Sequence, residues 1–154
     1  MSFAVEQRFI ALDRLIRASQ KKGLDEETAS YFCKLGCVLI CGNLERCVEL
    51  ILSERIAIKS PPQVMSFLKA YFRRGTNYDC DQIGQLLYRF DAEWGRAFDS
   101  FIEGNGAIKE GISSCYAVRN SVAHGGGGSL GPSVLRQYYE ASLTLIAHLE
   151  YVLQ

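Results

Sequence analysis

Arg119 and His124 stand near the end of a predicted helix and are the residues of this chain best suited to phosphate and proton-transfer chemistry. Arginine offers a fixed fork of donors that matches phosphate oxygens, and histidine exchanges a proton near neutral pH. Together they suit cleavage of a phosphodiester bond by the adjacent ribose 2′-hydroxyl, which needs a base, an acid and positive charge but no metal ion. A simpler interpretation stays open, because basic residues in a last helical turn also cap free carbonyl oxygens.

The predicted helix that carries this pair spans residues 108–124. At about 100° per residue, one stripe roughly 80° wide holds Arg119 together with apolar neighbours. A buried guanidinium without a partner is costly, so we expect Arg119 to reach a carboxylate, an anion or a water-filled groove. The members of the stripe are Ile108, Ile112, Cys115, Arg119 and Val122.

A second stripe of the same helix holds Tyr116, Asn120 and His124, spaced four residues apart. This spacing lets the amide of Asn120 lie near the imidazole and orient it. Arg119 and His124, however, are five residues apart, so they point about 140° away from each other on a regular helix. Two arrangements could bring them to one target: the helix unwinds at Gly125, or a second copy of the helix completes the site.

The elements that position these residues are predicted to be helices throughout, because no stretch alternates with period two. The sequence therefore predicts an all-α, up-down bundle of about five to seven helices, with residues 1–154 forming a single domain. The segment 81–103 leaves open whether it is one helix or two, with a break expected near Asp91. The predicted helices run from the N-terminus to a stop at 21–23, from a cap at Asp25 to Lys59, from Ser60 and Pro61 to Phe72, over 79–102, over 108–124 and over 132–153.

Composition narrows the class of protein further. Lys+Arg and Asp+Glu both number 17, which argues against broad nonspecific binding to nucleic acid and makes any phosphate recognition local. The longest apolar run is far too short to cross a bilayer, and the N-terminus does not fit a secretory signal, so we expect a cytoplasmic protein without membrane contact. The six cysteines form no C-x-x-C pair and are predicted to pack, reduced, in the interior, with neither a metal site nor a cofactor.

The string "RNSVAHG" near the end of the penultimate helix resembles the HEPN superfamily, and in particular its RiboL-PSP-type branch. The segments "CVLICGNLERCVELIL", "FDAEW" and "LRQYYEASLTLIAHLEYVL" also look like this branch. The resemblance therefore extends from about Ala29 to the C-terminus.

The resemblance implies a metal-independent endoribonuclease of a toxin, antiphage or RNA-processing system that acts as a homodimer on RNA. In such domains the arginine and histidine of both subunits meet in one cleft at the dimer interface. By this resemblance Arg119 binds phosphate and stabilises the transition state, His124 transfers protons, and Asn120 positions them. An antitoxin or another regulatory protein is a candidate further partner. The resemblance leaves silencing by nucleotidylation in doubt. Toxins that are silenced in this way carry the modified tyrosine two residues after the histidine, where this chain has Gly126.

Two further residues are candidate supporting groups. Glu45, on the long second helix, could pair with Arg119 or orient a histidine, or it could be an ordinary exposed carboxylate. Tyr116 could line the cleft or simply pack. His148 stands among apolar residues of the last helix and is predicted to be structural.

Exposed basic residues could guide RNA toward the cleft, or they could form an ordinary solvated face. They are Arg8, Arg14, Arg17, Lys21 and Lys22 on the first helix, and Lys69, Arg73 and Arg74 before Gly75.

Two other functions remain open at this point. The first is a catalytically inactive HEPN module for interaction or nucleotide binding, in which the same arginine serves interface pairing. The second is a helical scaffold unrelated to HEPN.

Overall fold

The computed structural model of the protein describes residues 2–20, 23–73, 75–126 and 128–154. These residues form seven α-helices and no strand, as the sequence predicted. Lys21, Lys22 and Arg74, which the sequence named as candidate RNA guides, and Gly127 of the glycine-rich loop lie outside the described residues. The helices are α1 (Phe3–Ser19), α2 (Glu26–Ala57), α3 (Pro62–Phe72), α4 (Cys80–Phe90), α5 (Ala92–Gly104), α6 (Gly106–Ala123) and α7 (Pro132–Val152).

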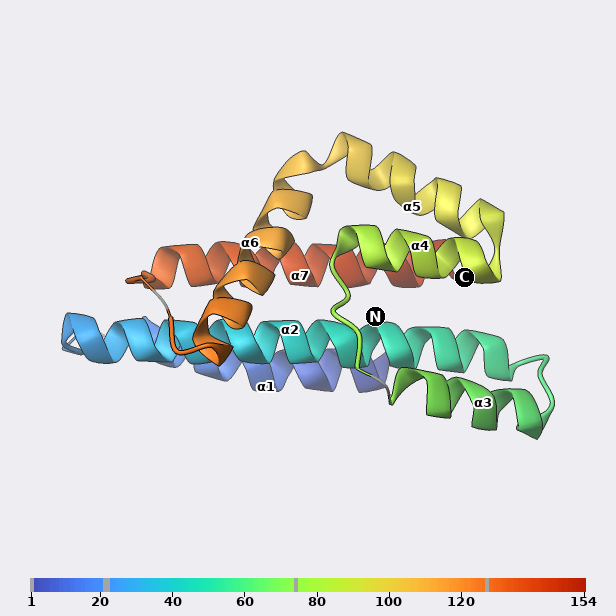
Figure 1. Ribbon diagram of the computed structural model, residues 1–154, viewed down its shortest axis with the longest axis horizontal. Coiled ribbons are helices and arrows are strands. Elements are labelled where there is room, and N and C mark those ends of the chain that lie inside the picture. The colour runs from blue at the N-terminus through green and yellow to red at the C-terminus, as the bar shows by residue number, and fades with distance from the viewer. Residues whose placement is uncertain (1, 21–22, 74, 127) are drawn as a thin grey trace.

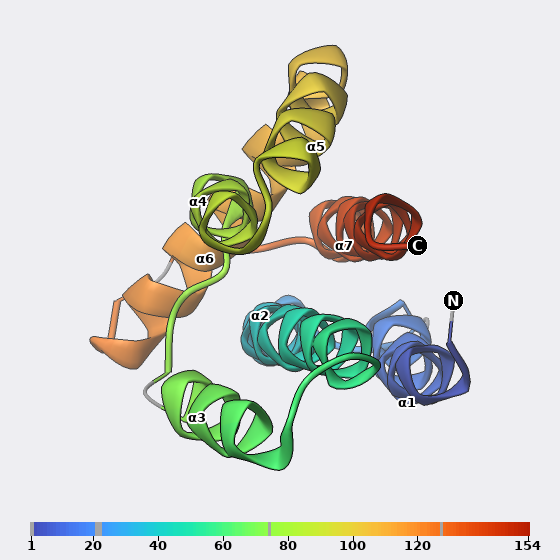
Figure 2. The same ribbon diagram turned by 90° about the vertical axis from the view of Figure 1, so that its right-hand side faces the viewer.

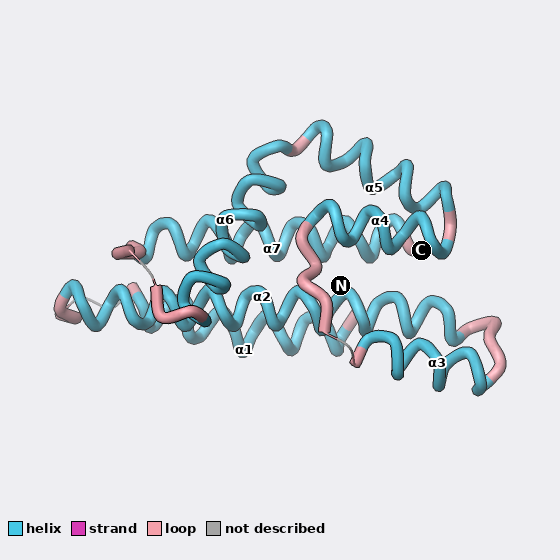
Figure 3. The backbone as a smooth tube through the Cα atoms, in the orientation of Figure 1, coloured by secondary structure: helices cyan, strands magenta, loops and turns pink. Residues whose placement is uncertain are grey.

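Aspartate caps begin three of these helices. The side chain of Asp25 accepts a hydrogen bond of 2.8 Å from the amide of Thr28, and Asp79 caps α4 in the same way. Asp91 has extended backbone geometry and accepts from the amide of Glu93 at 2.7 Å, so it ends α4 and begins α5. A carboxylate at the N-cap satisfies a free helical amide and favours the positive end of the helix. The segment 81–103 is therefore two helices, and the break falls at the expected residue (Figure 3).

The helix α2 lies at the centre of the fold and contacts α1, α3, α6 and α7. Figure 1 shows α1, α2 and α7 running along the long axis, with α3 beside the C-terminal half of α2. In the same view α6 crosses this layer obliquely, so it departs from a simple up-down arrangement. The end-on view in Figure 2 shows α4 and α5 as a pair on the side of the bundle away from α1, and this pair packs against α6 and, through α5, against α7. The crossing brings the end of α6 against α2.

The core is built around the cysteine-rich face of α2. All six cysteines are free thiols and buried, as predicted, and the sulfur atoms of Cys41 and Cys115 lie 3.8 Å apart where α2 meets α6. Glycine allows close packing at Gly36, where a Cβ would lie 2.7 Å from the side chain of Leu135 on α7, whereas a Cβ at Gly42 would meet nothing within 4 Å.

Several helix boundaries differ from the predicted ones by one or two residues, and α6 begins at Gly106, two residues before its predicted start. Pro61 is the N-cap of α3 and Pro62 is its first residue, one position later than expected, because a proline at the first helical position loses no helical hydrogen bond. The helix α2 ends at Ala57 instead of Lys59.

Within the described ranges, no helix is long and apolar enough to cross a membrane.

Candidate functional site

The C-terminus of α6 has a hydrogen-bonded cap that ends the helix at His124. The amide of Gly125 donates to the carbonyl of Val122 at 3.1 Å, and that of Gly126 donates to the carbonyl of Ser121 at 2.9 Å. These two bonds define a Schellman motif, in which the residue after the C-cap is left-handed. Gly125 has φ of 73°, which only glycine adopts at little cost. The predicted stop at Gly125 is confirmed, and the helix remains regular up to Ala123.

Gly126 lies close to Ser121. A Cβ at this position would lie 2.8 Å from the hydroxyl oxygen of Ser121 and 3.4 Å from its carbonyl oxygen, so a larger residue would require the Ser121 side chain to rotate away.

The guanidinium of Arg119 is held by three oxygen acceptors. Its Nη1 donates to the side-chain oxygen of Asn77 at 2.9 Å and to that of Asn120 at 3.1 Å. Its Nη2 lies 3.8 Å from Oε1 of Glu45, and the arginine side chain remains 33% exposed. We expected Arg119 to reach a carboxylate, an anion or a water-filled groove. Arg119 pairs with the carboxylate of Glu45, and part of its side chain also faces solvent.

The ion pair between Arg119 and Glu45 is long enough to leave donors available. No hydrogen bond from Nε or Nη2 of Arg119 to another described residue is formed, and 3.8 Å exceeds the usual length of a charge-assisted hydrogen bond. Burial raises the pKa of Glu45 above its ordinary value, the charge of Arg119 lowers it, and Glu49 one turn away raises it again. Oε1 of Glu45 is buried without a hydrogen bond. Of the three interpretations of Glu45, the structure supports pairing with Arg119.

Asn120 has a different neighbour from the one expected. Its side-chain oxygen accepts from Arg119, whereas its main-chain carbonyl accepts from the amide of His124 at 3.3 Å. The side chain of Asn120 therefore orients the guanidinium of the residue before it and not the imidazole. The side chain of His124 is exposed, and it makes no hydrogen bond or ion pair with any part of the chain that the structure describes.

Tyr116 packs and does not line an open cleft. It is 4% exposed, and its hydroxyl oxygen accepts a hydrogen bond of 3.0 Å from the main-chain amide of Tyr78. Burial raises its pKa well above the usual range, and the nearby Cys41 and Glu45 act in the same direction. Tyr116 thus ties α6 to the segment before α4, because it is the acceptor for a buried amide. The expected second stripe of Tyr116, Asn120 and His124 is for this reason not one exposed face.

Asn77 and Tyr78 belong to the site although the sequence did not single them out. They lie in the connection between α3 and α4, where Asn77 is exposed and Tyr78 is buried. Burial raises the pKa of Tyr78 to about 12, and the charges of Tyr71, Glu49 and Glu45 contribute in that order. Asn77 and Asp79 in the string "TNYD" are typical turn residues, and nothing in the string indicated a contact with a helix about 40 residues later.

His148 is structural, as predicted. Its ring stacks on Phe101 with the centroids 3.7 Å apart and the planes inclined by 10°. Burial lowers its pKa, while a hydrogen bond to the backbone of Ala97 acts in the other direction. In the described ranges no group of three or more His, Cys, Asp or Glu side chains could hold a metal ion.

The chain forms an all-helical bundle, and its arginine and histidine lie near the end of the penultimate helix. These are the features of the domain class that the sequence resemblance indicated. The family model described as RiboL-PSP-HEPN matches residues 5–154, so the chain belongs to this HEPN family. No curated protein and no solved structure matches the chain.

Proposed function

We propose that this protein is a metal-independent endoribonuclease of the HEPN toxin or defence type, acting as a homodimer. The observation that carries the proposal is the guanidinium of Arg119, oriented by Asn77, Asn120 and Glu45 yet partly open to solvent on the helix that ends at His124. An oriented cation with unused donors is what the charged phosphate of a transition state requires. Membership of the family supports the same direction.

The proposed reaction is an intramolecular transfer within the RNA strand. The imidazole of one His124 accepts the proton of a ribose 2′-hydroxyl, whose oxygen forms a bond to the adjacent phosphorus. The bond from phosphorus to the 5′-oxygen breaks, and a protonated imidazole supplies a proton to that leaving oxygen. Arg119 stabilises the negative charge on the crowded phosphate. The products are one strand ending in a 2′,3′-cyclic phosphate and one beginning with a 5′-hydroxyl.

A second copy of the chain is part of the proposal because one copy has one His124 at the site and the reaction uses two proton transfers. An exposed apolar face suited to such a partner lies on the N-terminal half of α2, where Tyr31, Leu35 and Leu39 are 62%, 47% and 42% exposed. This face continues into a groove of about 710 Å³ between α1 and α2, lined in part by Leu15 and Val38. Contiguous apolar surface of this kind is typical of protein interfaces. Glu45 follows six residues after Leu39 on the same helix, and the proposal requires that a twofold contact here bring the two sites together.

The test is cleavage of RNA by the purified chain in the presence of a chelator, with analysis of the product ends. We expect 2′,3′-cyclic phosphate products from the wild type and a loss of about 100-fold or more in Arg119→Ala and in His124→Ala. Arg136→Ala removes an exposed arginine that pairs with Glu140 on α7 and is the matched control, expected to cut as the wild type does. Equal cleavage by all four proteins would refute the assignment of the site.

One observation favours a second function, a catalytically inactive interaction module. The bonds from Arg119 to Asn77 and Glu45 hold α6, α2 and the connection before α4 together, which is a structural role in itself. Expression in a host separates the two functions. Growth arrest that His124→Ala relieves supports the nuclease, because the exposed imidazole has no part in that structural role.

A further inference from the structure

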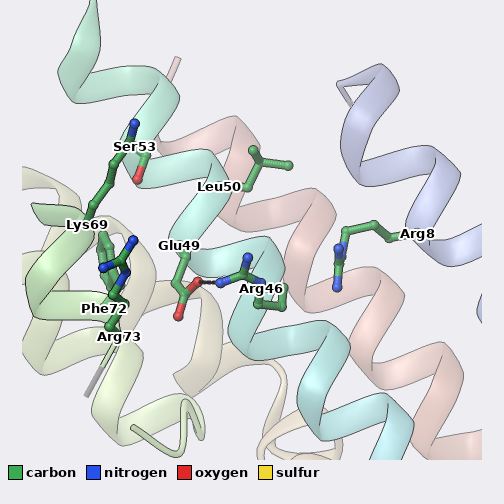
Figure 4. Close-up of a pocket in the computed structure, with 8 residues that line it drawn as sticks. All are labelled: Arg8, Arg46, Glu49, Leu50, Ser53, Lys69, Phe72 and Arg73. Carbon is green, nitrogen blue, oxygen red and sulfur yellow. Dashed lines mark hydrogen bonds and ion pairs between the residues drawn. The ribbon is translucent and has the colours of Figure 1, made fainter. Parts of the chain in front are cut away.

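A groove rich in positive charge runs across the outer face of α2, next to the candidate site. It has a volume of about 390 Å³ and is bordered by α1, α2 and α3. Figure 4 shows Lys69 and Arg73 of α3 on one side of α2 and Arg8 of α1 on the other, with Arg46 between them. The groove therefore collects cations from three consecutive helices of the chain.

The charges in this groove are poorly balanced. Its one carboxylate, Glu49, is paired with Arg46 on the same helix. Arg8 donates to the neutral side chain of Asn43 at 3.2 Å, and neither Arg8, Lys69 nor Arg73 forms an ion pair with any described carboxylate. In a chain whose net charge is zero, such a local excess is a feature of this surface and not of the composition. Clustered cations in a concave surface raise the local concentration of anions.

The groove lies one helical turn from the carboxylate that pairs with Arg119. Glu45, which pairs with Arg119, and Glu49, which lines the groove, are four residues apart on α2, and the charges of both raise the pKa of Tyr78. Arg73 ends α3, and Asn77 follows four residues later, so their Cα atoms are at most about 14 Å apart. Phosphates follow one another about every 3.4 Å along the axis of a helical strand. A strand of a few nucleotides therefore spans both places.

We propose that this groove is a second phosphate-binding site, which holds the RNA strand beside the bond that is cleaved at Arg119. The inference rests on the proposed function for its choice of ligand. Lys69 and Arg73 bind phosphates of the strand that extends away from the site, and Arg8 and Arg46 continue the path across α2. Contacts of this kind position a strand without reading its sequence.

The experiment measures binding separately from cleavage, in the full-length chain carrying His124→Ala. A fluorescein-labelled single-stranded RNA of mixed sequence is titrated by anisotropy over a series of salt concentrations. Adding Lys69→Ala and Arg73→Ala, two exposed positions, is expected to weaken binding about tenfold at low salt and to reduce the salt slope by about 1.4, since each phosphate contact on a single strand contributes about 0.7.

The matched control removes two exposed cations outside the groove, Lys109→Ala and Arg136→Ala. We expect this protein to bind RNA with the affinity and salt slope of the His124→Ala parent. The proposal is overturned if the groove variant behaves like the parent, or if the control weakens binding equally. It is also overturned if a polyglutamate peptide displaces the RNA at equal concentration, because the groove would then be a site for acidic protein.

Cleavage by the chain with native His124 distinguishes the two proposals. If RNA binds through the groove but is never cut, the nuclease fails and the groove stands. If RNA is cut equally well with and without Lys69 and Arg73, the groove fails and the nuclease stands.

Discussion

Arg119 on α6 donates a hydrogen bond of 2.9 Å to the side-chain oxygen of Asn77, which precedes it by 42 residues. The bond joins the helix that carries the arginine and histidine to the connection between α3 and α4. The guanidinium is thus oriented by a segment whose own position depends on the packing of two other helices. The site belongs to the fold and not to α6 alone.

Asn77→Ala removes this acceptor without touching the core, since Asn77 is exposed. We expect RNA cleavage to fall about tenfold because the guanidinium loses one of its orienting bonds, and the free energy of unfolding to fall by only about 1 kcal/mol. Steady-state cleavage and urea denaturation measure the two effects. Gln85→Ala, at another exposed amide, is the control. Unchanged cleavage would mean that Asn77 plays no part in orienting Arg119.

Tyr116→Phe leaves the buried amide of Tyr78 without its acceptor. A buried donor that loses its partner costs about 1–3 kcal/mol, so we expect the free energy of unfolding to drop by that amount. Hydrogen exchange at the amide of Tyr78 is expected to accelerate at the same time. Tyr151→Phe removes a hydroxyl from a side chain that is 70% exposed and is expected to change neither quantity. A fully stable Tyr116→Phe protein would contradict the role assigned to the hydroxyl.

Glu45→Gln tests the buried carboxylate through the pH dependence of stability. The pKa of Glu45 is higher in the folded chain than its ordinary value of 4.5, because burial outweighs the attraction of Arg119. Between pH 4.5 and the higher pKa of Glu45 in the folded chain, the folded state binds more protons than the unfolded state. The free energy of unfolding therefore falls as the pH rises above about 4.5. Glu45→Gln is expected to remove this decline.

Denaturation at a series of pH values measures the effect of Glu45. Arg119→Ala is expected to extend the decline to higher pH, because the pKa of Glu45 then rises further. Glu103→Gln, at an exposed position of α5, provides the control and should keep the decline of the wild type. If Glu45→Gln keeps it as well, another group is responsible.

Gly125→Ala strains the cap that ends α6, because φ is 73° at this residue. We expect a loss of about 1–2 kcal/mol in the free energy of unfolding, together with reduced RNA cleavage, since His124 is the residue next to the strained one. Gly128→Ala is the matched control in the same loop, where an added Cβ meets nothing within 4 Å. Equal stability of the two variants would show that the left-handed cap is not needed.

Leu35→Asp tests the proposed dimer face. Leu35 is 47% exposed, so a carboxylate there is tolerated by the single chain but disfavoured in an apolar interface. Sedimentation over a dilution series should show that the dissociation constant of the dimer rises by about tenfold or more, and RNA cleavage should fall in parallel. Phe67→Asp, on α3 at 68% exposure, should leave the dimer intact. A Leu35→Asp protein that stays dimeric would place the interface elsewhere.

The sequence by itself determined the helices and placed most of their ends within one or two residues. The caps at Asp25, Asp91 and Gly125 act through hydrogen bonds between residues at most five positions apart, so their consequences can be inferred from the order of residues alone. The position of Arg119 on an apolar stripe is local in the same sense, because it follows from the pitch of the helix. The likeness to HEPN domains likewise depends on short strings that need no coordinates.

Only the tertiary structure decided which partners these residues meet. The spacing along α6 predicted that the amide of Asn120 lies near His124, but in the structure its oxygen accepts a hydrogen bond from Arg119. Tyr116 is buried, and its hydroxyl oxygen accepts a hydrogen bond from the main-chain amide of Tyr78. Glu45 could have been any exposed carboxylate until α6 crossed α2 beside it. The physical reason is range: helical order comes from interactions within a few residues, whereas the acceptors of Arg119 depend on how distant segments bury their apolar faces against one another.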